Sequence, residues 1–284
     1  MSRFTYRAWG ESDIGNVKKQ NEDAYLLKAA NNDSEQILFA LVADGMGGLS
    51  NGDVASLGVK RAFEKWFMED LPKTLKEKDF EDALSQQWQQ IIFSENETLN
   101  KAKAPSGTTL TALLLYNGRF FTANIGDSRI YRLNKGRLYQ LTVDHSWVQE
   151  ALKAGYDPEE IERDPRRNTL TRCIGAGLSK NPETDYTTSR FDFGDYFLLC
   201  SDGLRHLITT DEMRRVLENE TLTTNEKAEL LIETAKERRE RDNITAIVIR
   251  CEAGDEAEGF AAGEAAAETA ELLDRTVKLD RLPV

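Results

Sequence analysis

The stretch ILFALVADGMGG, residues 37–48, holds the longest uninterrupted apolar run of the chain, Ile37–Ala43, and ends that run on an aspartate. The run is too short for a helix that stands alone, and no polar residue alternates within it as in a surface strand. It therefore predicts a central strand that is buried on both faces. A carboxylate at the end of such a strand is costly to bury, so Asp44 is a candidate functional residue.

The pattern of an aspartate at a strand boundary returns twice further along the chain. Asp202 follows the apolar run of FLLCSDGL, residues 197–204, and Asp242 immediately precedes the strand predicted for NITAIVIRC, residues 243–251. Because the end of one antiparallel strand lies beside the start of the next, we expect Asp44, Asp202 and Asp242 to gather at one rim of a sheet. Taken alone, an Asp-Gly motif is explained better by a turn, and it is the recurrence of the motif that favours a functional site.

Clustered carboxylates repel one another strongly where the dielectric constant is low, and a divalent cation would remove that repulsion. The candidate ligands are all oxygen atoms, with no thiolate or imidazole at a useful spacing, which favours Mg²⁺ or Mn²⁺ over zinc. The glycine after Asp44 lets the backbone approach closely enough for the carbonyl of Gly45 to act as a further ligand. We expect Gly47 and Gly48 to keep the mouth of the site open.

The rest of the chain alternates between strands in hairpins and helices in pairs. Apolar residues at helical spacing predict helices over residues 55–67 and 80–92. Residues 108–142 read as a meander of antiparallel strands, with a hairpin turn at Asn117-Gly118. Two more helices are predicted from capping boxes that begin at Thr209 and Thr223. The sequence thus predicts an α+β protein in which helices cover antiparallel sheets.

Composition narrows the class of protein. The chain has 284 residues and a net charge of -12, which argues against nucleic acid or an anionic membrane surface as the main partner. The three cysteines, Cys173, Cys200 and Cys251, are too few and too scattered for a disulfide framework. No N-terminal stretch resembles a signal peptide, and no apolar run is long enough to span a membrane. We therefore expect a cytoplasmic protein.

The composition changes at residue 253. Residues 253–284 are rich in Ala, Glu and Gly and contain eight acidic and three basic residues. We interpret residues 1–252 as one domain and residues 253–284 as an acidic, disordered tail. The apolar residues near the end of the tail make docking to another protein a further expectation.

Eight segments in this order closely resemble the bacterial branch of the metal-dependent, type 2C (PPM) protein serine/threonine phosphatases. They are VKKQNED, LVADGMGG, SGTTLTALLL, ANIGDSRIY, LTVDHS, LTRCIG, FLLCSDGL and RDNITAIVI. The resemblance covers roughly residues 5–250. It implies two antiparallel sheets packed as a sandwich between pairs of helices, a four-layer αββα arrangement with a small helical flap over about residues 145–170. It also implies a binuclear Mn²⁺ or Mg²⁺ centre.

The resemblance assigns roles to the acidic motifs. Asp44 should bridge both metal ions, Gly45 should offer its carbonyl, and Asp202 and Asp242 should hold one of the ions. These three aspartates are the expected catalytic carboxylates. Together the ions would activate a shared water molecule that attacks phosphorus in line, without a phosphoenzyme.

Three more acidic residues complete the implied site. Glu22 and Asp23 belong to the segment on the side of the second ion, partly through water. Asp127 should hold a weaker third ion, as in bacterial members of the family. Ser128 and Ser201 adjoin implied ligands, but turn hydrogen bonding explains them better than a nucleophilic role does.

The chain departs from the family pattern at Lys18, where the family usually has an arginine that clamps the substrate phosphate. Lysine keeps the positive charge but lacks the planar, two-pronged guanidinium group of arginine. We therefore expect weaker binding of the substrate phosphate that still depends on this position. The alternative is a solvated lysine beside Lys19.

A second departure concerns the general acid for the leaving alcohol. Met46 stands where eukaryotic relatives have a histidine proposed for that role, and methionine cannot donate a proton. A metal-bound water or His145 could substitute, although His145 precedes a helix cap and fits a structural role better. No functional signal attaches to His206.

The leading hypothesis is a phosphoserine and phosphothreonine protein phosphatase that opposes a eukaryotic-like kinase in a bacterial cell. Its expected partners are phosphorylated proteins, including such a kinase, with no nucleic acid and no membrane insertion. Two alternatives stay open: an inactive phosphoprotein-binding regulator and a small-molecule phosphomonoesterase.

Overall fold

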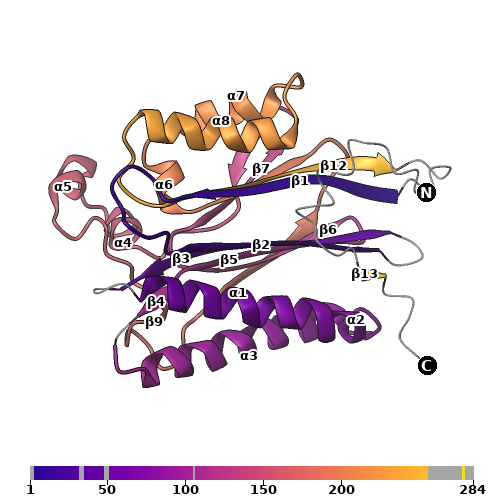
Figure 1. Ribbon diagram of the computed structural model, residues 1–284, viewed down its shortest axis with the longest axis horizontal. Helices are drawn as coiled ribbons and strands as arrows, with labels where there is room; N and C mark the ends of the chain where they lie inside the picture. Colours follow the sequence, from indigo (N-terminus) through magenta and orange to yellow (C-terminus); the bar gives the residue numbers. More distant parts are fainter. Residues whose placement is uncertain (1–2, 32–34, 48–50, 105, 255–276, 279–284) are drawn as a thin grey trace.

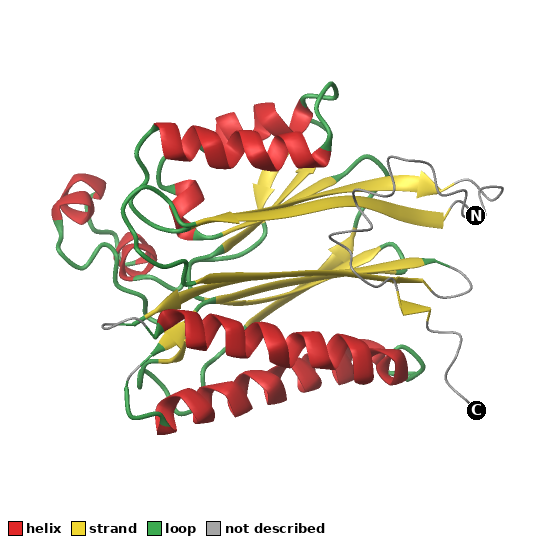
Figure 2. Cartoon of the chain, viewed as in Figure 1, coloured by secondary structure: helices red, strands yellow, loops and turns green. Residues whose placement is uncertain are grey.

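The computed structural model describes residues 3–31, 35–47, 51–104, 106–254 and 277–278. Two β-sheets lie face to face, and helices cover the outer face of each sheet (Figures 1 and 2). The predicted four-layer α+β sandwich is therefore confirmed.

One sheet combines strands from both ends of the chain. Its order is β1 (Arg3–Asp13), β12 (Ile244–Gly254), β11 (Tyr196–Cys200), β7 (Arg129–Asn134) and β8 (Arg137–Gln140). Every neighbouring pair is antiparallel. Three helices cover its outer face: α6 (Asp202–Arg205), α7 (Thr210–Glu218) and α8 (Thr224–Glu237) (Figure 1).

The second sheet is built around the apolar run seen in the sequence. Its order is β10 (Asp185–Arg190), β6 (Arg119–Ile125), β5 (Leu110–Tyr116), β3 (Gln36–Met46), β2 (Asp23–Asn31) and β13 (Val277–Lys278). The short strand β4 (Gly107–Thr108) pairs with the end of β3, and β9 (Ile174–Gly175) pairs with β4. The helices under this sheet are α1 (Gly52–Glu69), α2 (Leu71–Thr74) and α3 (Phe80–Lys101) (Figure 1). The short helix α2 was not predicted.

Strand β3 confirms the prediction of a central strand buried on both faces. Residues Ile37, Phe39, Leu41 and Ala43 pack in one hydrophobic cluster with α1 and α3. The alternate residues Leu38, Ala40 and Val42 pack in a second cluster, between the sheets, with Phe197 of β11 and Ile247 of β12. Because side chains alternate along a strand, the next position on the inter-sheet face is Asp44. The strand itself thus directs this carboxylate between the two sheets.

The predicted turns and caps are present. Asn117 and Gly118 have φ values of 53° and 66°, as the β5–β6 hairpin requires. Thr209 and Thr223 each form a reciprocal capping box, at the starts of α7 and α8. Ser146 caps α4 (Trp147–Lys153), which forms the flap with α5 (Pro158–Arg163).

Strand β12 extends slightly beyond residue 252, the predicted end of the domain. Ala253 and Gly254 continue β12 and pair with Phe4 and Arg3 of β1. Further on, Val277 and Lys278 pair in parallel with the outer edge of β2. The prediction of a disordered tail otherwise falls outside the described residues. No helix in the described ranges is both long and apolar enough to cross a membrane.

Candidate metal and phosphate site

A cleft of about 410 Å³ is lined by residues of β3 and α6 and by residues just after the flap. These elements lie at one end of the sandwich (Figure 1). Every site residue predicted from the sequence except Asp23 lines the cleft. These residues are Lys18, Glu22, Asp44, Gly45, Asp127, Asp202 and Asp242. Segments from five separate parts of the chain therefore converge on one cavity.

The expectation that the aspartates share one rim of a single sheet is wrong. Asp44 belongs to β3 of the larger sheet, whereas Asp202 begins α6 just after β11 and Asp242 lies just before β12 of the other sheet. The two sheets pack face to face, so their ends meet and bring the carboxylates together. Strand pairing also brings Asp23 next to Asp44, because the two residues lie directly opposite each other on β2 and β3.

The cleft has an excess of negative charge. Burial raises the pKa of Asp44 well above its ordinary value, and the charges of Asp23, Asp202, Asp127 and Asp242 raise it further. One oxygen of Asp202, Oδ1, is buried without a hydrogen-bond partner in the described part of the chain. Both observations fit a site that a hard cation would neutralise.

The backbone at Gly45 leaves no room for a side chain. A Cβ atom there would lie 2.2 Å from the carbonyl oxygen of Gly52 and 2.5 Å from that of Glu22. The amide of Gly45 donates to the Glu22 carbonyl at 3.1 Å, and the amide of Gly52 donates to Glu22 Oε1 at the same distance. Glycine is required here because three backbone segments meet beneath the cleft.

Asp23 lies below the cleft and connects the two sheets. Its Oδ2 accepts hydrogen bonds from Thr245 Oγ1 at 2.6 Å and from Ser201 Oγ at 2.8 Å. Burial raises the pKa of Asp23 to about 7, although both hydroxyls oppose the shift. Ser201 is thus engaged as a hydrogen-bond donor, in keeping with the structural role predicted for it.

Lys18 reaches the acidic centre, with its Nζ 2.6 Å from Asp242 Oδ1. Burial alone would lower the pKa of Lys18, but the hydrogen bond to Asp242 and the charges of Asp242, Glu22 and Asp44 outweigh it, and the pKa is raised. Asp242 thereby turns toward the lysine. Among the described residues, no three acidic, His or Cys side chains are arranged tightly enough to hold a metal ion as they stand.

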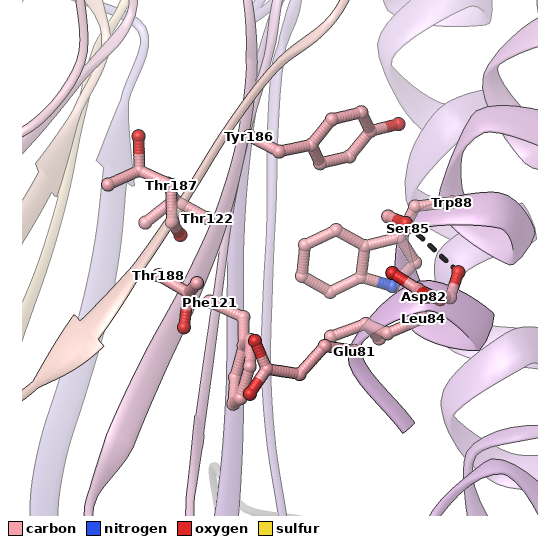
Figure 3. A pocket seen from close by; sticks show the side chains of 10 residues that line it. All are labelled: Glu81, Asp82, Leu84, Ser85, Trp88, Phe121, Thr122, Tyr186, Thr187 and Thr188. Atoms are coloured by element: carbon pink, nitrogen blue, oxygen red, sulfur yellow. Dashed lines mark hydrogen bonds between the residues drawn. The ribbon is translucent and has the colours of Figure 1, made fainter. Parts of the chain in front are cut away.

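A second pocket, of about 200 Å³, lies between α3 and strands β6 and β10 (Figure 3). Trp88, Phe121 and Tyr186 supply aromatic walls, and Glu81 and Asp82 supply carboxylates (Figure 3). No predicted site residue lines it. The chemistry predicted from the sequence therefore belongs to the larger cleft.

Comparison with known proteins agrees with this geometry. A family model described as protein phosphatase 2C matches residues 10–238. The chain belongs to the protein phosphatase 2C family.

Relatives in this family are similar over nearly their whole length. The serine/threonine phosphatase stp of Listeria monocytogenes serotype 4b is 35% identical over 246 residues, covering 84% of this chain and 93% of that protein. A solved structure of the Mycobacterium tuberculosis serine/threonine phosphatase PstP/Ppp is 32% identical, with a TM-score of 0.70, covering 87% of this chain and 99% of the other. The catalytic domain of PstP, solved in complex with two manganese ions, is 30% identical with a TM-score of 0.69, covering 88% and 99%.

The metal chemistry of the protein phosphatase 2C family can be tested against the residues present here. The cleft is lined by the carboxylates of Asp44, Asp202, Asp242 and Glu22, which offer only oxygen ligands and carry an excess of negative charge. The backbone of Gly45 also lines the cleft. These residues fit hard divalent cations. Asp127 pairs with an arginine, Arg205, whereas Asp242 pairs with Lys18.

Several residues of this 2C-family site had not been identified from the sequence. Asn243 accepts a hydrogen bond from the Glu22 amide at 2.9 Å and donates to the carbonyls of Ile14 and Gln20. Thr109 Oγ1 accepts from the amide of Asp44 at 2.9 Å. His206, to which no role had been assigned, lines the cleft with Nε2 3.6 Å from Asp202 Oδ2. Of these residues, only Asn243 could have been found from the sequence, because it directly follows the predicted ligand Asp242.

His145 lies at the base of the flap and does not line the cleft. Its Nδ1 accepts a hydrogen bond from the Gly126 amide at 3.1 Å, and its Nε2 lies 3.0 Å from Asp185 Oδ2. Because Nδ1 is an acceptor, we assign the ring proton to Nε2. The ring therefore joins the flap to the β6–β7 turn and to β10, which supports a structural role over that of a general acid.

The environment of His145 predicts a loss of stability in mild acid. Burial lowers its pKa below 6.5, although Asp185 opposes the shift. The unfolded chain therefore takes up a proton at a higher pH than the folded protein does, so this contribution to stability is present above pH 6.5 and is lost as the pH falls through the lowered folded pKa. In urea titrations at pH 7.5 and pH 5.5, His145→Gln should show a smaller loss between the two pH values than the wild type. An equal loss in both proteins would contradict this role.

Proposed function

We propose that this protein hydrolyses phosphoserine and phosphothreonine in proteins, with two Mn²⁺ or Mg²⁺ ions bound in the cleft. The observation that carries the proposal is the meeting of Asp44, Asp202 and Asp242 from both sheets in one cleft that contains Lys18. Family membership and the printed activities of the relatives support it.

Each residue of the cleft has a distinct part in this proposal. Asp44, at the centre of the acidic group, would contact both ions, Asp202 and Asp242 would hold one of them, and Glu22 and the carbonyl of Gly45 would face the other. When bound, the ions would supply Lewis-acid activation of water near neutral pH. Asp23, below the cleft, holds the sheets in register and so positions Asp44.

Lys18 would bind the substrate phosphate. Its amine now contacts Asp242, and it would exchange that carboxylate for a phosphate oxygen when a substrate enters. The lining of the cleft also includes three apolar side chains, those of Met46, Leu170 and Leu178. These side chains would exclude water from part of the cleft and contact the peptide around the phosphorylated residue.

The proposed setting is signalling in the cytoplasm of a bacterium, against a serine/threonine kinase. The described cysteines are all buried thiols, in keeping with a reducing compartment. We further propose that the C-terminal tail serves as a docking segment for a partner protein.

The test compares three substrates with and without Mn²⁺. We expect Mn²⁺-dependent hydrolysis of p-nitrophenyl phosphate and of a phosphothreonine peptide, with little hydrolysis of free phosphoserine. Asp202→Asn should abolish all hydrolysis. Hydrolysis of free phosphoserine at the rate of the peptide would favour the small-molecule phosphomonoesterase, and binding of the peptide without turnover would favour the inactive regulator.

A further inference from the structure

Arg205 forms an ion pair with Asp127 beside the cleft. The guanidinium Nη2 lies 2.5 Å from Asp127 Oδ2, and Nε donates to the Asp127 backbone carbonyl at 3.3 Å. The two side chains are only 17% and 13% exposed. One arginine therefore pairs with the carboxylate and also binds the backbone that carries it.

A second pair of the same kind lies next to the first. Arg129 donates to both carboxylate oxygens of Asp144, from Nε at 2.8 Å and from Nη2 at 2.6 Å. Gln140 also donates to Asp144. Asp127 and Asp144, on the flap side of the cleft, are thus each paired with an arginine.

The neighbouring group of Asp44, Asp202 and Asp242, the acidic centre of the cleft, is different. Among the described residues, one lysine, Lys18, lines the cleft beside Asp44, Asp202 and Asp242, and it forms an ion pair with Asp242. A divalent cation would relieve repulsion in that centre. At Asp127 it would have to displace a guanidinium that stays charged at all accessible pH values, or bind beside it against like-charge repulsion. The third ion implied by family resemblance therefore does not fit Asp127 in this chain.

We propose that Arg205 takes the place of a third metal ion at Asp127 and serves as a permanent, built-in cation. The proposal rests on the proposed function only in placing metal ions in the neighbouring centre. Arg205 is the last residue of α6 and Asp202 is the first, while Asp127 lies in the β6–β7 turn. The ion pair thus fixes α6 against that turn and positions Asp202, whatever the concentration of free divalent cation.

Counting bound Mn²⁺ tests the proposal without reference to turnover. Equilibrium dialysis against Mn²⁺ up to millimolar concentration, followed by elemental analysis, should give about two ions per chain for the wild type. Arg205→Ser should bind one more, and the double variant Arg205→Ser/Asp127→Asn should lose that extra ion. Arg205→Lys keeps a cation and should stay at the wild-type count. Arg214→Ser removes a surface arginine paired with Asp211 and is the matched control.

Two results would overturn the proposal. One is a third ion in the wild type that Asp127→Asn removes, and the other is an unchanged count in a folded Arg205→Ser. Should Arg205→Ser fold poorly, Arg205→Gln removes the charge, keeps a hydrogen-bond donor, and should give the same extra ion. A wild type that binds no ion would refute the metal centre of the proposed function, and an Asp127-dependent gain in the Arg205 variants would still support the role of Arg205.

Discussion

Asp44→Asn is expected to lower kcat for a phosphothreonine peptide by about 10³-fold or more, because the central carboxylate of the proposed metal site is lost. The same change should raise the melting temperature of the metal-free protein. The reason is that burial, and then the charges of neighbouring aspartates, raise the pKa of Asp44, and the neutral amide removes both costs. Loss of activity with a gain of stability separates a functional carboxylate from a structural one.

The matched control for Asp44 is Asp70→Asn, at a surface aspartate 3.3 Å from Lys73 in an exposed ion pair. We expect it to change neither rate nor melting temperature appreciably, since exposed pairs contribute little. Activity is followed by phosphate release and stability by calorimetry after metal removal. An Asp44→Asn protein that keeps a tenth of the wild-type rate, or that melts well below the wild type, would contradict the assignment.

Lys18→Ala should raise KM for a phosphopeptide roughly 10- to 100-fold, because a charge-assisted hydrogen bond to the phosphate is lost. The effect on kcat should be smaller, as expected for an interaction made both in the ground state and in the transition state. Lys18→Arg restores the charge and adds a planar fork, so it should recover or improve on the wild-type KM.

The neighbouring Lys19 provides the control for Lys18. Lys19→Ala removes the same charge one residue away, and it should leave KM within about twofold because Lys19 does not line the cleft. Steady-state kinetics on one phosphopeptide with all three variants decides the matter. Equal KM values for Lys18→Ala and Lys19→Ala would mean that Lys18 is merely solvated and binds no phosphate.

Local sequence features predicted most of the fold. Ile37–Ala43 could only be a doubly buried strand, and the Asn117-Gly118 turn and the capping boxes at Thr209 and Thr223 specify their elements within a few residues. The sandwich itself followed from family resemblance. No local pattern shows which faces of two sheets will meet, and that is why the aspartates were placed at one rim of a single sheet.

The residues of the candidate site also fall into two groups, those that local sequence predicted and those that only the folded structure shows. Asp44, Asp202 and Asp242 stand out because each interrupts or borders an apolar strand. Arg205 and Asn243 act through partners far away in the sequence: Arg205 pairs with Asp127, and Asn243 holds the loop around Gln20. An arginine on a short polar helix has no distinctive local pattern, so its effect on Asp127 appears only when the chain is folded.

The most direct measurement is a crystal of the wild-type protein soaked in Mn²⁺, with diffraction data collected at the manganese absorption edge. We predict strong anomalous peaks between Asp44, Asp202 and Asp242 in the cleft, and none at Asp127. The absence of peaks among these three aspartates, in a crystal that diffracts well with the cleft open to solvent, would contradict the account.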